Sequence, residues 1–65
     1  MKWIRLPSGD HQAIGRNGDY LVWREGKLWR SRYWNNERTI HFLLPRKPTL
    51  TEAKAQCEDN RYWEE

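Results

Sequence analysis

Arginine and tryptophan alternate in the middle of the chain, where residues 29–34 read WRSRYW. Successive side chains of a β-strand point to opposite faces of a sheet, so Arg30, Arg32 and Trp34 would share one face. Guanidinium groups bind phosphates and guanine edges. Indole rings can pack on sugars and bases. The spacing therefore indicates a surface that could face a nucleic acid.

No other group of side chains has the spacing of a catalytic or metal site. The sequence lacks a glycine-rich phosphate loop, a His-Glu metal motif, and a nucleophile with a base at a fixed spacing. Cys57 is the single cysteine, and its place in a predicted helix favours a buried apolar role over thiolate chemistry. We therefore expect no enzymatic activity, no metal, no cofactor and no small-molecule substrate.

Length and composition limit the architecture to one small domain, residues 1–65. A chain of this size buries only about 60% of the surface that it exposes when unfolded. Five tryptophans, three tyrosines and one phenylalanine exceed what such a core can hold, and the net charge of +3 permits binding of a polyanion. Without a long apolar run or a signal peptide, the sequence predicts a cytoplasmic protein that does not enter a membrane.

Four turn signals set the expected strand register. Asn17-Gly18, Glu25-Gly26 and Asn35-Asn36 are predicted two-residue loops, because glycine and asparagine accept the positive φ of tight hairpin turns. A longer turn at residues 7–10 would set Leu6 opposite His11. The expected pairs are Ala13 with Val22, Ile14 with Leu21, Val22 with Trp29, Arg32 with Thr39, Arg30 with His41, and Leu28 with Leu43.

Alternation along these strands divides the side chains between a core face and a second face. The core face is expected to carry Ile4, Leu6, Ala13, Gly15, Tyr20, Val22, Trp29, Ser31, Tyr33, Ile40 and Phe42. The second face is expected to carry Trp3, Arg5, Ile14, Leu21, Trp23, Leu28, Arg30, Arg32, Trp34, Thr39, His41 and Leu43.

The hydrophobic period changes after the proline-containing residues 45–48, which are predicted to end the last strand. Thr49 and Glu52 match a helix capping box, and a helix is expected over about residues 50–60. Small Ala53 and Cys57 would bring this helix close to Ser31 on the central strand. The tail would either fold Tyr62 and Trp63 over an open edge of the core or fray.

These elements predict a single α+β domain. An antiparallel meander of four or five strands, at about residues 2–6, 11–16, 19–24, 27–34 and 37–44, would carry one C-terminal helix on one face.

Residues 19–60 resemble the three-strands-then-helix module of plant ethylene-response-type DNA-binding domains and of the amino-terminal arm-binding domains of tyrosine-recombinase integrases. The resemblance lies in Gly26, Lys27 and Trp29, and in Thr51, Glu52 and Ala53. In those families the sheet face away from the helix enters the major groove of DNA, which implies DNA contacts for Trp23, Arg30, Arg32 and Trp34. Residues 49–54, TLTEAK, also resemble small bacteriophage and prophage proteins, which implies a protein that binds or inhibits a host protein.

Two functional hypotheses follow. The first is a DNA-binding accessory protein that holds double-stranded DNA on its second face; the alternative is a module that docks on a protein, or forms a homodimer, through an apolar patch on the same face. A solvated face without a partner also remains open. The expected binding residues are Trp23, Leu28, Arg30, Arg32, Trp34, Thr39, His41 and Leu43.

Overall fold

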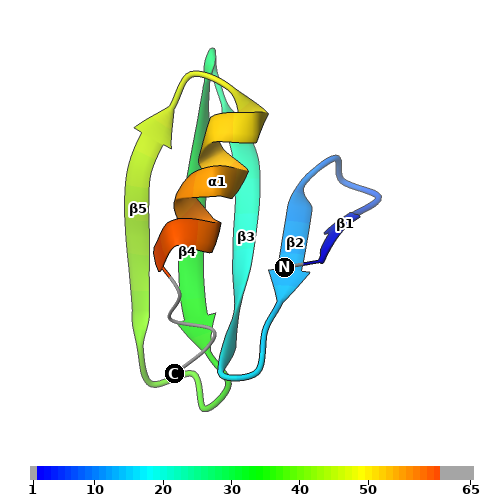
Figure 1. The fold of residues 1–65 in the computed structure, drawn as a ribbon. Coiled ribbons are helices and arrows are strands. Elements are labelled where there is room, and N and C mark those ends of the chain that lie inside the picture. Colours follow the sequence, from blue (N-terminus) through cyan, green and yellow to red (C-terminus); the bar gives the residue numbers. More distant parts are fainter. Residues whose placement is uncertain (1, 61–65) are drawn as a thin grey trace.

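The computed structural model describes residues 2–60, which form one five-stranded antiparallel sheet and one helix (Figure 1). The strand order follows the chain, which confirms the predicted α+β meander. The predicted packing of Tyr62 and Trp63 lies outside the described residues. The elements are β1 (Trp3–Arg5), β2 (His11–Ile14), β3 (Gly18–Glu25), β4 (Leu28–Asn35), β5 (His41–Lys47) and α1 (Leu50–Asn60).

Helix α1 covers one face of the three long strands, β3 to β5 (Figure 1). Ala53 and Cys57 on the helix and Ser31 on β4 are all fully buried, so the helix does approach the central strand through small side chains, as predicted. Thr49 caps the helix, which begins at Leu50, since its Oγ1 accepts a hydrogen bond from the Glu52 amide at 3.1 Å. This is one of the two bonds of the predicted capping box; the reciprocal bond from the Thr49 amide to the Glu52 carboxylate is not formed among the described residues.

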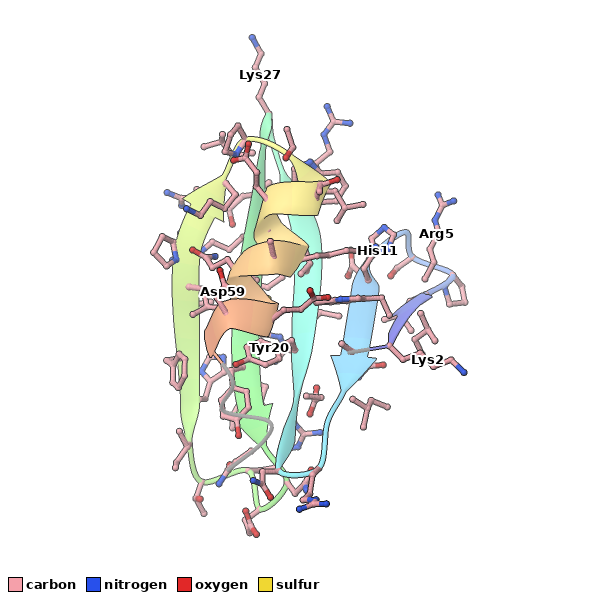
Figure 2. The ribbon with its side chains drawn as sticks, in the orientation of Figure 1. Lys2, Arg5, His11, Tyr20, Lys27 and Asp59 are labelled. Atoms are coloured by element: carbon pink, nitrogen blue, oxygen red, sulfur yellow. The ribbon has the colours of Figure 1, made fainter. Side chains whose placement is uncertain are left out.

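Aromatic rings fill the core beside these small residues. The centroid of the Tyr33 ring lies 5.1 Å from that of Tyr20 and 5.3 Å from that of Phe42. Figure 2 shows Tyr20 beside the C-terminal end of α1, and it belongs to one buried cluster with Ala53 and Cys57 of the helix. Val22 and Leu44 complete the buried sheet surface. Trp29 is half-buried and packs against this core from the same face.

The β3–β4 loop is Gly26-Lys27, so the predicted Glu25-Gly26 loop is wrong by one residue. Gly26 has a φ of 67°, and a glycine at the first position of a two-residue loop suits the tight turn that needs a positive φ only there. The register moves by two residues, which places Val22 opposite Ser31. An even shift leaves every side chain on its predicted face.

The β4–β5 loop covers residues 36–40 and is longer than predicted. The buried Asn35 side chain organises it: Oδ1 accepts from the Thr39 and Ile40 amides at 2.9 and 2.8 Å, and Nδ2 donates to Thr39 Oγ1 at 2.8 Å. Thr39 therefore lies in a loop and not opposite Arg32. Ile40, predicted for the core, is 53% exposed.

The longer loop also changes the partners of β5. His41 lies opposite Trp34, and Leu43 lies opposite Arg32, so the predicted pairs of Arg30 with His41 and Leu28 with Leu43 are wrong. The register is again displaced by an even number of residues, so the side chains of His41 and Leu43 remain on the face predicted for them.

The β2–β3 turn is displaced by one residue from the predicted Asn17-Gly18 loop and has Arg16 and Asn17 at its centre. Ile14 pairs with Asp19, and the Gly15 amide donates to the Gly18 carbonyl at 2.8 Å. Gly18 is the first residue of strand β3 and not a turn residue. The position suits glycine because a Cβ on it would collide with the Trp34 carbonyl oxygen. Ala13 keeps its buried face but lies opposite Tyr20 instead of Val22.

The β1–β2 hairpin is displaced by an odd number of residues. The Gly9 amide donates to the Leu6 carbonyl at 2.9 Å, and Gly9 has a φ of 95°, as in a three-residue hairpin loop. Trp3 therefore pairs with Ala13, packs against the core and exchanges faces with Ile4, which is 46% exposed. The predicted faces of β1 are wrong.

Strand β5 continues through Pro45 to Lys47, beyond its predicted end. It pairs only with β4, and an edge strand tolerates a proline, which has no amide hydrogen to donate. Ser31 pairs with Leu44 and Trp29 with Lys47, so Pro45 and Arg46 together stand opposite one residue. This is a β-bulge.

Candidate nucleic-acid interface

The outer face is the surface of the sheet opposite α1. Cross-strand pairing arranges its side chains in rows, and successive rows lie about 7 Å apart along the strands. From the loop end to the hairpin tip the rows are Asp19, Trp34 and His41; Leu21, Arg32 and Leu43; Trp23 and Arg30; and Glu25 and Leu28.

A stack of two rings occupies the first row. The centroids of Trp34 and His41 lie 4.2 Å apart with an angle of 27° between the planes. Arg38 Cζ lies 5.7 Å from the centroid of the Trp34 ring, and Arg38 Nη1 lies 2.8 Å from Asp19 Oδ1. We call Asp19, Trp34, Arg38 and His41 the Trp34 cluster.

Arg38 reaches this position from an unusual backbone conformation. Its φ is 60°, in the left-handed region, which costs a residue with a Cβ about 1–2 kcal/mol. The Arg38 amide donates to the Asn35 carbonyl at 3.1 Å. The loop built around Asn35 thus holds a guanidinium group over the Trp34 ring and on Asp19.

A second ion pair lies near the opposite end of the outer face. Glu25 Oε1 accepts from Arg46 Nε at 2.6 Å, and the Trp23 indole donates to the same carboxylate. The bond from Arg46 is the main reason that the pKa of Glu25 is below its ordinary value. Both carboxylates of β3, Asp19 and Glu25, are therefore paired with arginines from outside β4.

Arg30 and Arg32 lie between these two ends, side by side on the outer face of β4. Neither has a carboxylate within 4 Å among residues 2–60, and Arg30 Nε is buried without a hydrogen-bond partner in that part of the chain. Both side chains are half-buried. Among the described residues, the centre of the outer face therefore carries two positive charges without an ion pair, and Glu25 acts on Arg30 only at longer range.

Apolar side chains interrupt this surface but do not form the predicted patch. Leu28 and Leu43 are 39% and 49% exposed, but they lie two rows apart, with Trp23 and Arg30 in the row between them. Ile4 and Ile14, which are 46% and 66% exposed, instead line a shallow hollow of about 250 Å³ on the outer face of the β1–β2 hairpin.

Most of the predicted binding residues do come together. Arg32, Trp34, His41 and Leu43 occupy two adjacent rows, and Trp23 and Arg30 share the next row. Leu28 lies at the hairpin tip, and Thr39 does not belong to the sheet. The sequence prediction missed Asp19, Arg38, Glu25 and Arg46. The polar run at residues 36–39 could have indicated a loop able to return Arg38 onto Trp34.

Cys57 lies on the other side of the sheet and provides no reactive thiolate. Burial raises the pKa of its thiol to about 11. Among the described residues there is no group of three side chains placed to hold a metal ion. No helix in that range is long and apolar enough to cross a membrane.

No protein-family model, curated protein or solved structure matches this chain.

Proposed function

We propose that this protein is a small, non-enzymatic DNA-binding module that contacts DNA with its outer face. The observation that carries the proposal is the pair Arg30 and Arg32. They lie two positions apart on one strand, share a face, and have no ion pair within the described chain. Guanidinium groups in this state are available to phosphate oxygens.

The distribution of charge supports the same orientation. Three exposed carboxylates, Glu52, Glu58 and Asp59, lie on α1, on the opposite side of the sheet. Figure 2 shows Asp59 on the helix and Lys27 pointing away from the tip of the β3–β4 hairpin. A polyanion would be repelled from the helix and attracted to the outer face.

The test is the double variant Arg30→Ala, Arg32→Ala, compared with the wild type by titration of DNA at several salt concentrations. Loss of two phosphate contacts should reduce the slope of log K against log salt by roughly 1.4–1.8 and weaken binding. Wild-type nonspecific affinity should lie near 10⁻⁴–10⁻⁶ M, an order-of-magnitude expectation at physiological salt.

The matched control is Arg5→Ala, Arg24→Ala. This variant also loses two positive charges, but the pairing of Arg5 with His11 and of Arg24 with Trp29 places both on the helix side. It should retain the wild-type slope. Equal effects of the two double variants would mean that only net charge matters, and an unchanged Arg30, Arg32 variant would remove the proposal.

A second candidate function is self-association or protein binding through the same face. It is favoured by the exposed Leu28 and Leu43, and by Ile4 and Ile14 on the β1–β2 hairpin. A homodimer would be two-fold, since one self-complementary surface closes most simply in that way. Sedimentation should then show a dimer for the wild type and a folded monomer for Leu43→Asp. A wild type that is monomeric at high concentration would exclude the dimer.

A further inference from the structure

We infer that the DNA held on the outer face is single-stranded, with an unpaired base stacked on the Trp34 cluster and phosphates on Arg30 and Arg32. This inference rests on the proposed function and specifies its ligand. It follows from the exposed ring stack, from the partial burial of Arg30 and Arg32, and from the small number of positive charges on the outer face that have no ion pair.

The ring stack is open on the His41 side. Trp34 lies between Asp19 on β3 and His41 on β5, and Arg38, which bonds to Asp19, is also over its ring. His41 is exposed, and β5 is the last strand of the sheet, so no other strand formed by residues 2–60 lies beside it. A base could extend the stack there.

Only an unpaired base has a ring face to offer. Inside a duplex both faces of each base are covered by its neighbours, whereas bases of a single strand stack on aromatic side chains of the protein. A single strand could therefore contact both the exposed rings and the arginines that lack an ion pair, whereas a duplex could contact only the arginines.

The two arginines do not extend fully into solvent. Arg30 and Arg32 are half-buried, and the Nε atom of Arg30 is itself buried. Reading base edges in the major groove, about 8.5 Å deep, needs side chains that protrude. Partly buried arginines whose Cα atoms are about 7 Å apart along β4 suit a backbone that lies on the surface of the sheet.

The surrounding charges also favour a short strand. Arg38 and Arg46 are already engaged by Asp19 and Glu25, which leaves Arg30 and Arg32, with Lys27 at the hairpin tip, for phosphates. About three contacts match a few nucleotides of a single strand, and the expected salt slope is near −2, against near −3 for the same number of contacts to duplex DNA.

The experiment measures binding of a labelled oligothymidine and of a labelled, fully paired, blunt-ended duplex to the wild type and to histidine variants. We expect the single strand to bind at least about tenfold more tightly than the duplex. His41→Ala should weaken single-strand binding by about 5- to 100-fold, the usual effect of losing one stacking side chain, and leave duplex binding unchanged. His41→Phe should restore single-strand binding, because it keeps a ring at this position.

The matched control is His11→Ala. His11 lies opposite Val22, on the helix side of the sheet, so its loss should leave single-strand affinity unchanged; thermal unfolding checks that each variant is folded. A duplex that binds as tightly as the single strand, or an inert His41→Ala, overturns this inference but not the proposed function. A folded wild type that binds neither DNA overturns both.

Discussion

The two faces of strand β4 carry side chains of different size and charge. On the inner face the strand carries Ser31, fully buried beneath Ala53 and Cys57. On the outer face it carries Arg30 and Arg32, long side chains that no other element of residues 2–60 covers. A small side chain lies where the helix approaches the strand, and long charged side chains lie on the face without a helix. Alternation along one strand thus produces two surfaces of different chemistry.

Two tryptophans show the same contrast in detail. Trp3 has Lys54 Nζ 5.6 Å from its ring centroid, and its Nε1 donates to Glu58 Oε2 at 2.9 Å. Both partners come from α1, so the ring fastens β1 to the helix. Trp34 has a cation at nearly the same distance, 5.7 Å, but its partners lie on the outer face and its indole N–H makes no hydrogen bond within the described residues.

The largest expected effect is a difference in the free energy of unfolding between variants of two neighbouring residues on opposite faces of β3. Tyr20 is fully buried, so Tyr20→Ala should reduce the free energy of unfolding by about 3–5 kcal/mol, most of the stability of so small a domain. Leu21 is half-buried on the outer face, and Leu21→Ala should cost roughly half as much or less. Urea unfolding measures both, and equal losses would contradict the assignment of the faces.

Gly18→Ala should have the next largest effect, because it disturbs both faces together. The added Cβ would collide with the Trp34 carbonyl oxygen and lie 2.8 Å from Asn35 Cα, so β4 must move. We expect a loss of about 1–3 kcal/mol, as for other overpacked sites, and altered NMR shifts of His41.

The matched control for this change is Gly26→Asn. The Cβ added at Gly26 meets nothing within 4 Å, and the positive φ costs asparagine less than most other residues, so this variant should lose less stability than Gly18→Ala. If Gly26→Asn cost as much as Gly18→Ala, backbone conformation and not the close approach to β4 would explain both.

A smaller effect should follow from Trp3→Phe, which removes the hydrogen bond to Glu58 and keeps a ring near Lys54. The expected loss of stability is about 0.5–1.5 kcal/mol. In a double-mutant cycle with Glu58→Gln the two losses should not add, because both changes weaken the same bond. Full additivity would show that the indole and the carboxylate do not interact.

The smallest expected effect is a dependence of stability on pH that comes from His11 on the inner face. Burial, with Lys54 and Arg5 nearby, lowers the pKa of His11 from its ordinary value of 6.5. The unfolded chain then binds a proton more readily than the folded one, so the free energy of unfolding should decrease as the pH falls through 6.5. In His11→Gln this component should disappear from melting curves recorded between neutral and mildly acidic pH.

The sequence predicted the faces of four strands correctly although it predicted every register wrongly. Between β2 and β3, β3 and β4, and β4 and β5 the registers differ from the prediction by an even number of residues, which preserves the faces. The β1–β2 hairpin differs by an odd number, and Trp3 and Ile4 exchanged faces. Alternation within a strand is a local property, whereas register depends on the conformation of each loop.

Those loop conformations depend on side-chain contacts that the turn propensities of the loop residues do not predict. The β4–β5 loop is long because the Asn35 side chain bonds to the Thr39 and Ile40 amides, and Asn35-Asn36 alone indicates only a tight turn. The same loop carries Arg38 to Trp34. The Trp34 cluster therefore could not be assembled from the sequence, although Trp34 and His41 were each assigned to the outer face.

The β-bulge at Pro45 also bears on how copies of this chain can meet in a crowded cell. A strand added beside β5 would find no amide hydrogen at Pro45 and would meet the like charges of Arg46 and Lys47 if a second β5 approached. Ladder-like growth into fibres is thereby blocked at this edge. The opposite edge of the sheet is β1, which is only three residues long, and so short an edge strand offers few backbone groups to an added strand.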